Sequence, residues 1–248
     1  VYMIIGGKDL LNGKRFDKGG YILTYDYDKW SFIDPKEAQK KLNLPRNPRD
    51  YTSIAVTTDD SNDEIVYASS MGDGVIQYKN GTPVQSYNEK NAFKETAGGY
   101  GSGYCYIDGL AFDKNGNLWM TSSEVNHAVL VLDKAGAWHR LDIEQLRGVY
   151  TINDILITST NDKWIYVPRN TPKLVMIPNS ESLDEVSSYE FTTLIDTDGK
   201  ELTPSNYTCV AEDKDGYIWV GTNRGAVYFT KPRISSAEDK AATRCTRV

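Results

Sequence analysis

The two histidines, His127 and His139, are the side chains of this sequence best suited to acid–base chemistry near neutral pH. His127 lies in a turn close to Glu124, and the two together would be a conceivable acid–base pair. We expect this turn at the rim of the fold and His139 on an outer strand, so neither imidazole is placed to meet a substrate at the centre of the molecule. The sequence therefore predicts no catalytic residues, and it favours a protein that is not an enzyme.

Two aspartate-rich turns resemble the beginning of a calcium-binding loop, Asp113-Lys-Asn115-Gly-Asn117 and Asp213-Lys-Asp215-Gly. Both lack the later ligands, above all the glutamate that closes a twelve-residue calcium loop. Hairpin turns stabilised by the aspartate side chain explain the same residues. The three cysteines are far apart in the chain and have neither CxxC nor histidine spacing for zinc: Cys105, Cys209 and Cys245. We therefore expect no metal and no cofactor.

Small polar residues stand at one level when four apolar strands are aligned by their apolar cores: Thr52, Asp108, Asn153 and Thr208. Strands that surround a common axis would present these side chains to it near one mouth, where a ligand or a column of water is held. The alternative is that the four side chains hydrogen-bond to one another and to buried water. We predict a ligand-binding axial mouth formed by these four residues.

A long glycine-rich segment, residues 88–104, interrupts the pattern of short strands. Loops of this length are functional or mobile. Tyr100, Tyr104 and Tyr106 lie in or beside it, and their aromatic faces suit the apolar faces of sugar rings. We predict ligand contacts from these three tyrosines, with a mobile, solvated loop as the alternative.

The elements that must position these residues form a repeat. The stretch 206–229 reads as three short strands joined by turns at Asp-Gly and Arg-Gly, where glycine accepts a positive φ. Residues 109–132 have the same pattern. An aromatic residue holds the same place in four copies, with steps of 52, 45 and 55 residues between Tyr67, Trp119, Trp164 and Trp219. A β-rich period near 50 with a fixed aromatic position predicts a β-propeller built of four-stranded antiparallel blades.

We expect the propeller domain to cover residues 1–233, and residues 234–248 to be a linker or the start of a further strand. About five blade units are visible, at 1–33, 51–88, 106–143, 152–202 and 206–232. The first unit lacks its innermost strand. Either the C-terminal tail supplies that strand and closes a five-bladed ring, or the chain is part of a larger ring; we favour the larger ring.

Two local features are specific enough to predict by themselves. Asn80-Gly81 between alternating apolar residues is typical of a two-residue hairpin turn. The segment 34–41 has proline at a first-turn position followed by good helix formers, so a short helix is expected there.

The bulk composition excludes two classes of partner. A net charge of −6 and an isoelectric point near 5.1 give no field that would attract nucleic acid. No apolar run approaches the roughly 18 residues that would indicate a membrane span in this segment. The chain opens within a strand pattern at Val1, which suggests a segment cut from a longer protein.

The repeat resembles a known family. EDKDGYIWVGTNRGAVYF and FDKNGNLWMTS are similar to the two-component-regulator propeller repeat of extracytoplasmic proteins of Bacteroidetes. More narrowly, the order of VYMIIGG, GGYILTYDYDKWSFI, the segment 51–81 and the GTNRG unit resembles PorZ-type proteins of the type IX secretion system. The resemblance implies a periplasmic or cell-surface propeller, with lipopolysaccharide or glycan as ligand and further blades beyond this segment. It carries no catalytic residue set.

These observations favour a non-catalytic, extracytoplasmic binding or scaffolding module, acting in type IX secretion or cell-surface attachment. Polysaccharide or lipopolysaccharide and proteins of a secretion or attachment complex are the expected partners. One alternative is the glycan-sensing ectodomain of a hybrid two-component system, which related propellers form. Another is a propeller lyase similar to the streptogramin lyases, whose sequences GNLWMTS resembles.

Overall fold

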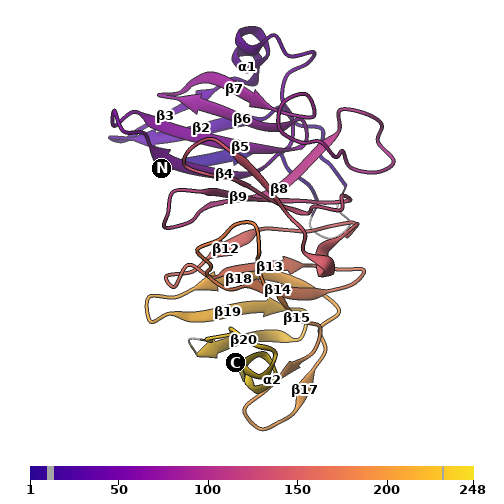
Figure 1. The fold of residues 1–248 in the computed structure, drawn as a ribbon. Helices are drawn as coiled ribbons and strands as arrows, with labels where there is room; N and C mark the ends of the chain where they lie inside the picture. The colour runs from indigo at the N-terminus through magenta and orange to yellow at the C-terminus, as the bar shows by residue number, and fades with distance from the viewer. Residues whose placement is uncertain (10–13, 231) are drawn as a thin grey trace.

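The computed structural model describes residues 1–9, 14–230 and 232–248. Its antiparallel sheets are stacked in chain order, so that the N-terminal and C-terminal sheets lie at opposite ends of the molecule (Figure 1). The first sheet has three strands: β1 (Tyr2–Ile5), β2 (Tyr21–Asp26) and β3 (Lys29–Ile33). The fold is all-β, as the sequence predicts.

The second and third sheets have four strands each. The second contains β4 (Tyr51–Thr58), β5 (Glu64–Gly72), β6 (Gly74–Lys79) and β7 (Thr82–Tyr87). The third contains β8 (Cys105–Phe112), β9 (Leu118–Ser122), β10 (Val129–Leu132) and β11 (Trp138–Leu141). A short antiparallel pairing between the end of β5 and the start of β8 joins the two sheets into one continuous, eight-stranded surface.

The fourth and fifth sheets follow the same antiparallel order. The fourth contains β12 (Ile155–Ile157), β13 (Lys163–Val167), β14 (Lys173–Ile177) and β15 (Tyr189–Phe191). The fifth contains β18 (Tyr207–Glu212), β19 (Tyr217–Thr222), β20 (Gly225–Thr230) and β21 (Thr246–Arg247). In chain order, a separate hairpin of β16 (Leu194–Ile195) and β17 (Glu201–Leu202) comes between the fourth and fifth sheets. The first strands of neighbouring sheets contact one another, β4 with β8, β8 with β12 and β12 with β18, as strands around a propeller axis must.

The two local predictions are confirmed. Asn80 and Gly81 have φ values of 48° and 75°, and they connect β6 to β7 in the two-residue turn that requires positive φ at both positions. Helix α1 spans Pro35–Leu42; the carboxylate of Asp34 accepts the backbone N–H of Lys36 and caps its first turn. Two further helical segments are a 3₁₀ turn, Glu144–Leu146, and α2, Ala237–Ala242.

The aromatic residue at the fixed place of the repeat packs between successive sheets. Tyr67 lies in the cluster between the second and third sheets, Trp119 between the third and fourth, and Trp164 between the fourth and fifth. Trp119 and Trp164 are each 1% exposed. In the fifth sheet, Ile218 and Val220 are buried against the fourth sheet. The aromatic residue between them, Trp219, therefore faces away from the fourth sheet.

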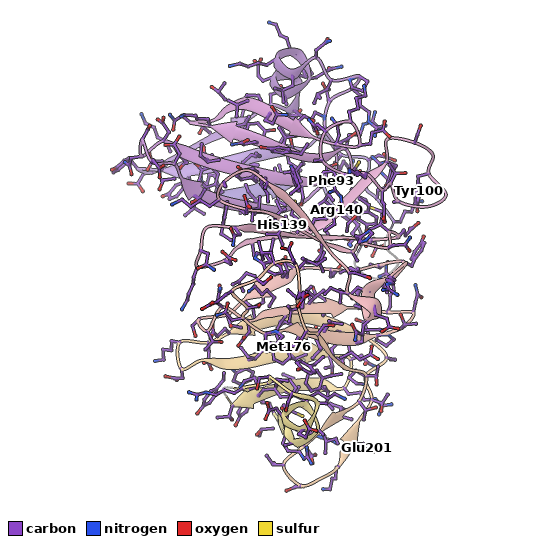
Figure 2. The ribbon with its side chains drawn as sticks, in the orientation of Figure 1. Phe93, Tyr100, His139, Arg140, Met176 and Glu201 are labelled. Carbon is purple, nitrogen blue, oxygen red and sulfur yellow. The ribbon has the colours of Figure 1, made fainter. Side chains whose placement is uncertain are left out.

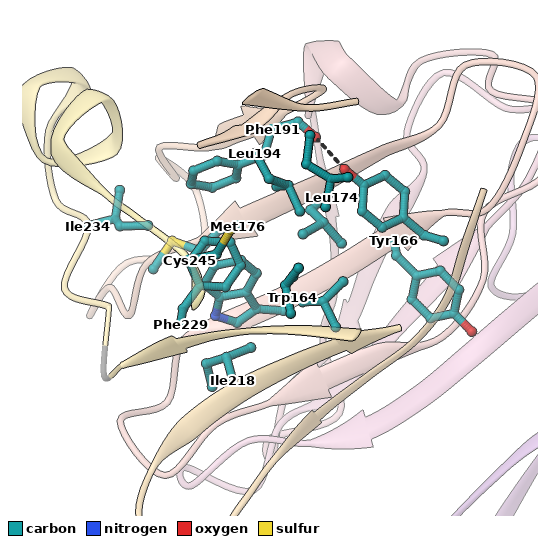
Figure 3. Packing of buried hydrophobic residues seen from close by; sticks show 14 residues of the cluster. Trp164, Tyr166, Leu174, Met176, Phe191, Leu194, Ile218, Phe229, Ile234 and Cys245 are labelled. Atoms are coloured by element: carbon teal, nitrogen blue, oxygen red, sulfur yellow. Dashed lines mark hydrogen bonds between the residues drawn. The ribbon is translucent and has the colours of Figure 1, made fainter. Parts of the chain in front are cut away.

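The core between the fourth and fifth sheets shows this packing most fully (Figure 3). The Trp164 ring lies 5.9 Å from the Phe191 ring and 5.6 Å from the Phe229 ring, measured between centroids. Ile234 and Cys245, from the C-terminal tail, are buried in the same cluster. Three segments distant in the sequence therefore share one core.

The C-terminal tail does not supply the missing strand of the first sheet. β21 pairs antiparallel with β20 as the fourth strand of the fifth sheet, and Val227 is opposite Arg247. The anchor is the burial of Ile234 and Cys245, which a sequence pattern of charged and small residues does not reveal. The five-bladed ring closed by the tail, one of the two alternatives from the sequence, is therefore wrong. β1 pairs with β2 alone, so the first sheet lacks an inner strand among the described residues.

The aspartate-rich turns are hairpin turns, as expected. One oxygen of the Asp113 carboxylate accepts the backbone N–H groups of Asn115 and Asn117, and the other accepts the indole N–H of Trp119 at 2.9 Å. Asp213 repeats this arrangement with its own turn and the indole of Trp219 at 2.8 Å. The aspartate thus closes the turn and fixes the ring that packs between sheets.

Replacing Asp113 by alanine should lower the free energy of unfolding by about 2 kcal/mol, because the buried indole N–H of Trp119 loses its acceptor. Urea denaturation measures the change. Asp60→Ala, an exposed position on the β4–β5 turn, is the matched control and should change stability by less than about 0.5 kcal/mol. Equal stability of the two variants would contradict this role of Asp113.

Candidate functional site

A cavity of about 330 Å³ opens where the inner strands begin. Its lining includes three of the four residues predicted for the axial mouth, Thr52, Asp108 and Asn153. Thr208 is not part of the lining; its backbone carbonyl instead accepts the hydroxyl of Tyr166, which does line the cavity. The alignment of inner strands by their apolar cores therefore brings three residues to one cavity and leaves one outside it.

A buried ion pair stands at this cavity. The ammonium of Lys8, from the segment after β1, contacts the carboxylate of Asp108 on β8, and their side chains are 7% and 2% exposed. The ammonium also donates to the hydroxyl of Tyr106 at 3.0 Å and approaches the carbonyl of Ile152 at 3.4 Å. Lys8 therefore links the first sheet to the third sheet and to the segment before the fourth.

The electrostatics of Asp108 are set by opposing effects. Desolvation raises the pKa of its carboxyl, and the Lys8 ammonium together with a hydrogen bond from the Ser123 hydroxyl opposes that rise. Burial is the largest of these effects, and the net direction is upward. The Lys8–Asp108 pair thus places two opposite charges in the buried interior of the fold.

The other predicted axial side chains bond within the protein. The Thr52 hydroxyl lies 2.6 Å from the Ile107 carbonyl, to which it donates. The side-chain amide of Asn153 donates to the Tyr166 hydroxyl at 3.1 Å. Both partners lie outside the predicted set of four, so these bonds satisfy the two side chains without joining the predicted residues to one another.

Asp154 is one of the polar cavity residues that sequence reasoning missed, together with Lys8 and Tyr166. It follows Asn153 directly, is exposed to solvent and lines the cavity. Its surroundings raise the pKa of its carboxyl, first through desolvation, with the nearby Asp108 charge adding to the rise. The sequence signal that could have found Asp154 is the adjacent pair Asn153-Asp154 directly before the apolar strand β12.

Close approach of the inner strands requires a glycine at position 109. A Cβ there would lie 2.7 Å from the backbone nitrogen of Ile155 and 2.8 Å from the Asp154 carboxylate. Gly109 therefore lets β8 and the start of β12 pass close enough to form one wall of the cavity.

The three loop tyrosines do not share one environment. Tyr100 is 47% exposed, whereas Tyr104 and Tyr106 are 8% and 2% exposed. Figure 2 shows Tyr100 on the projecting loop between β7 and β8. Its ring stacks on that of Tyr104, with centroids 4.4 Å apart. Tyr106 belongs to the axial site through Lys8, so Tyr100 alone of the three offers an exposed aromatic surface.

A second cavity, of about 410 Å³, lies between this loop and the segment that leads from α1 into β4. Tyr100 and Tyr104 line one side of it, and Arg46 and Asp73 line another. We call it the loop cleft. Sequence reasoning found its aromatic side through the glycine-rich segment but missed Arg46 and Asp73, which lie in other parts of the chain.

The histidines have partners away from both cavities. His127 Nδ1 lies 2.6 Å from the Glu95 carboxylate, so Glu95 rather than Glu124 is its partner. The conceivable acid–base pair of His127 with Glu124 is therefore replaced by a pair of His127 with Glu95. His139 lies on β11, 3.0 Å from the Asp133 carboxylate. Neither histidine lines the axial cavity or the loop cleft.

Within residues 1–9, 14–230 and 232–248, no three histidine, cysteine or acidic side chains are grouped as metal ligands. The cysteines are free thiols, with Cys105 and Cys245 buried and Cys209 exposed. No helix in the described part of the chain is long and apolar enough to cross a membrane.

Replacing Lys8 by methionine should lower the free energy of unfolding by about 3–5 kcal/mol, because Asp108 would remain buried without its cation. Equilibrium urea unfolding measures this loss. The double variant Lys8→Met, Asp108→Asn should recover part of it, since no charge is then left buried. A single variant as stable as the wild-type chain would show that the ion pair does not support the fold.

Comparison with known proteins places this geometry in a recognised fold. The repeat family described as two component regulator propeller matches residues 201–224, which cover β17, β18 and β19. No curated protein sequence matches the chain.

Three solved structures illustrate the likeness. PorZ of Porphyromonas gingivalis, described as an essential surface component of the type IX secretion system, superposes with a TM-score of 0.80 at 19% identity. The match covers 99% of this chain and 33% of PorZ. The extracellular domain of the putative hybrid two-component system BT4673 of B. thetaiotaomicron gives 0.58 at 16% identity, over 86% of this chain and 26% of that one. A putative 6-phosphogluconolactonase of Bacteroides uniformis gives 0.54 at 12% identity, over 92% and 63%.

The chain spans about one third of the length of PorZ, and identities of this size establish the fold alone. The matched repeat, the stacked antiparallel sheets and the axial contacts of their first strands agree with one another. The chain is a β-propeller protein that carries the two-component-regulator propeller repeat.

Proposed function

We propose that this chain is a non-catalytic, extracytoplasmic binding or scaffolding module that acts in type IX secretion or cell-surface attachment. The observation that carries the proposal is the superposition on PorZ over 99% of this chain. PorZ is described as a bacterial surface component of that secretion system. The same location and a related task follow for this chain if the shared fold reflects a shared role.

The chemistry of the two cavities supports binding rather than turnover. A general base must reach the reacting group, and both histidines are held by carboxylates outside the cavities. The axial side chains of Thr52 and Asn153 bond to neighbouring protein groups. The lactonase-like structures match at lower identity than PorZ, so they add no argument for catalysis.

The proposed ligand is a polysaccharide or lipopolysaccharide, and protein partners of the secretion or attachment complex are a further proposed class. We propose two contact regions. One is the axial mouth, with Asp154 joined to the predicted set of Thr52, Asp108, Asn153 and Thr208. The other is the loop between β7 and β8, which carries Tyr100 and Tyr104 and leads into Tyr106 on β8.

A sensing ectodomain is the second candidate function. It is favoured by the likeness to the extracellular domain of BT4673, which is described as part of a putative hybrid two-component system. Both candidates require ligand binding. They differ in whether the complete protein continues into a membrane span and a signalling domain.

We also propose that the propeller domain, residues 1–233, is part of a larger ring. β1 has no strand on its inner edge, and the outer face of the first sheet exposes Met3, Trp30 and Phe32 by 51%, 58% and 66%. Apolar sheet faces of this kind are normally covered. A further blade would cover this face and pair with the free edge.

The ligand proposal predicts that the purified chain binds bacterial lipopolysaccharide or polysaccharide in biolayer interferometry. The axial variant Asn153→Ala, Asp154→Asn should bind about tenfold more weakly if the axial mouth holds the ligand, since hydrogen bonds to a carboxylate are lost. Asp198→Asn, an exposed carboxylate of the β16–β17 hairpin, is the control and should bind as the wild type does. No binding to any of these ligands would contradict the proposed function.

The larger ring predicts protection of the first sheet in the full-length protein. Hydroxyl-radical footprinting should find Trp30 and Phe32 protected, whereas Tyr27, 91% exposed on the neighbouring β2–β3 turn, should stay reactive. Reaction of Trp30 as fast as that of Tyr27 would contradict coverage by another blade.

A further inference from the structure

The loop cleft combines an aromatic surface with a hydrogen-bonding wall, and its charges cancel. We propose that it binds one uncharged pyranose unit of a glycan, stacked on Tyr100 and hydrogen-bonded by the Arg46–Asp73 pair. This inference rests on the proposed glycan-binding function and names the site and the class of sugar. The cleft volume of about 410 Å³ lies within the roughly 300–1,000 Å³ typical of ligand sites.

The aromatic surface is held in place before any ligand arrives. Tyr100 stacks on Tyr104 with their rings 19° from parallel, and Tyr104 is buried and donates from its hydroxyl to the Met71 carbonyl at 3.3 Å. The Tyr100 hydroxyl is also hydrogen-bonded to that of Tyr150. A ring that is already ordered loses little conformational freedom when a sugar stacks on it.

Arg46 and Asp73, which also line the cleft, supply donors and acceptors in a fixed arrangement. Arg46 Nη2 lies 2.7 Å from Asp73 Oδ1, and Asp73 Oδ2 accepts the backbone N–H of Arg49 at 3.0 Å. The Arg46 side chain is 45% exposed, so N–H groups not used by Asp73 remain available to a ligand. A planar guanidinium beside a carboxylate matches neighbouring sugar hydroxyls, each of which both donates and accepts.

The charges that line the loop cleft favour an uncharged ligand. Arg46 and Lys90 are balanced by Asp73 and Glu89, and Asp73 engages the guanidinium directly. The whole chain carries a net charge of −6. A phosphorylated or uronic-acid sugar would gain no net attraction here and would compete with Asp73 for Arg46.

The loop tip around Tyr100 leaves room for a ligand. Gly99 and Gly101 have φ values of 82° and 87°, and a Cβ at either position would meet no atom within 4 Å. The stem of the loop is anchored, because Phe93 is 2% exposed and the Glu95 carboxylate accepts the backbone N–H of Asn126 at 2.7 Å. The stem therefore holds the Tyr100 ring over the cleft.

The test is isothermal titration of the purified chain with neutral tetrasaccharides of glucose, galactose and mannose, and with phosphorylated and uronic-acid oligosaccharides of equal length. We expect at least one neutral sugar to bind, with an affinity unchanged between low and high salt. Tyr100→Ala should weaken that binding about tenfold, the size of one lost aromatic contact. Tyr27→Ala is the control: it removes a tyrosine that is 91% exposed, against 47% for Tyr100, and that does not line the loop cleft, so it should leave the binding unchanged.

Arg46→Gln provides a second measurement at another lining residue of the cleft and should also weaken binding, whether or not Tyr100→Ala folds normally. Binding that survives both substitutions but is lost in the axial variant would overturn the cleft and leave the proposed function standing. Binding of the anionic sugars alone would overturn the preference for an uncharged ligand. Failure of every saccharide and of lipopolysaccharide to bind would overturn the cleft and the proposed function together.

Discussion

The whole fold depends on one constraint: each antiparallel sheet has two apolar faces, and both must be covered by a neighbour. The repeated aromatic residue meets this constraint at three of the four interfaces between sheets, through Tyr67, Trp119 and Trp164. The aspartate that closes the preceding turn fixes the indole of Trp119, so turn geometry and sheet packing are set by one side chain. Repetition of this unit explains why the sheets stack in chain order (Figure 1).

The same stacking brings the inner strands together and creates a polar interior at the axis. Lys8 and Asp108 are both almost fully buried there, which is costly for either charge alone and tolerable for the pair. Thr52 and Asn153 are similarly satisfied by neighbouring groups of the protein. Much of the axial polarity therefore holds sheets in register, and Asp154 is the carboxylate left facing the cavity.

The segment with an exposed surface for a ligand lies outside the repeated units. Strand and turn residues of the repeated units are occupied by packing, whereas the insertion between β7 and β8 has a fixed stem and an exposed tip. Together with the segment from α1 to β4 it forms the loop cleft, and both Tyr100 and Arg46 line this cleft. The features most specific to this chain are thus carried by the segment that departs most from the common pattern.

The sequence by itself determined the all-β class, the repeat, the Asn80-Gly81 turn and the short helix, because these depend on local conformational preference and on periodicity. It also selected three residues of the axial cavity, since equivalent positions in repeated strands share one level. Only the tertiary structure decided that the tail completes the fifth sheet, that Glu95 rather than Glu124 holds His127, and that Lys8 neutralises Asp108. The two side-chain pairings join residues 32 and 100 apart and the tail pairing joins residues 20 apart, and single contacts of this kind leave no periodic trace in a sequence.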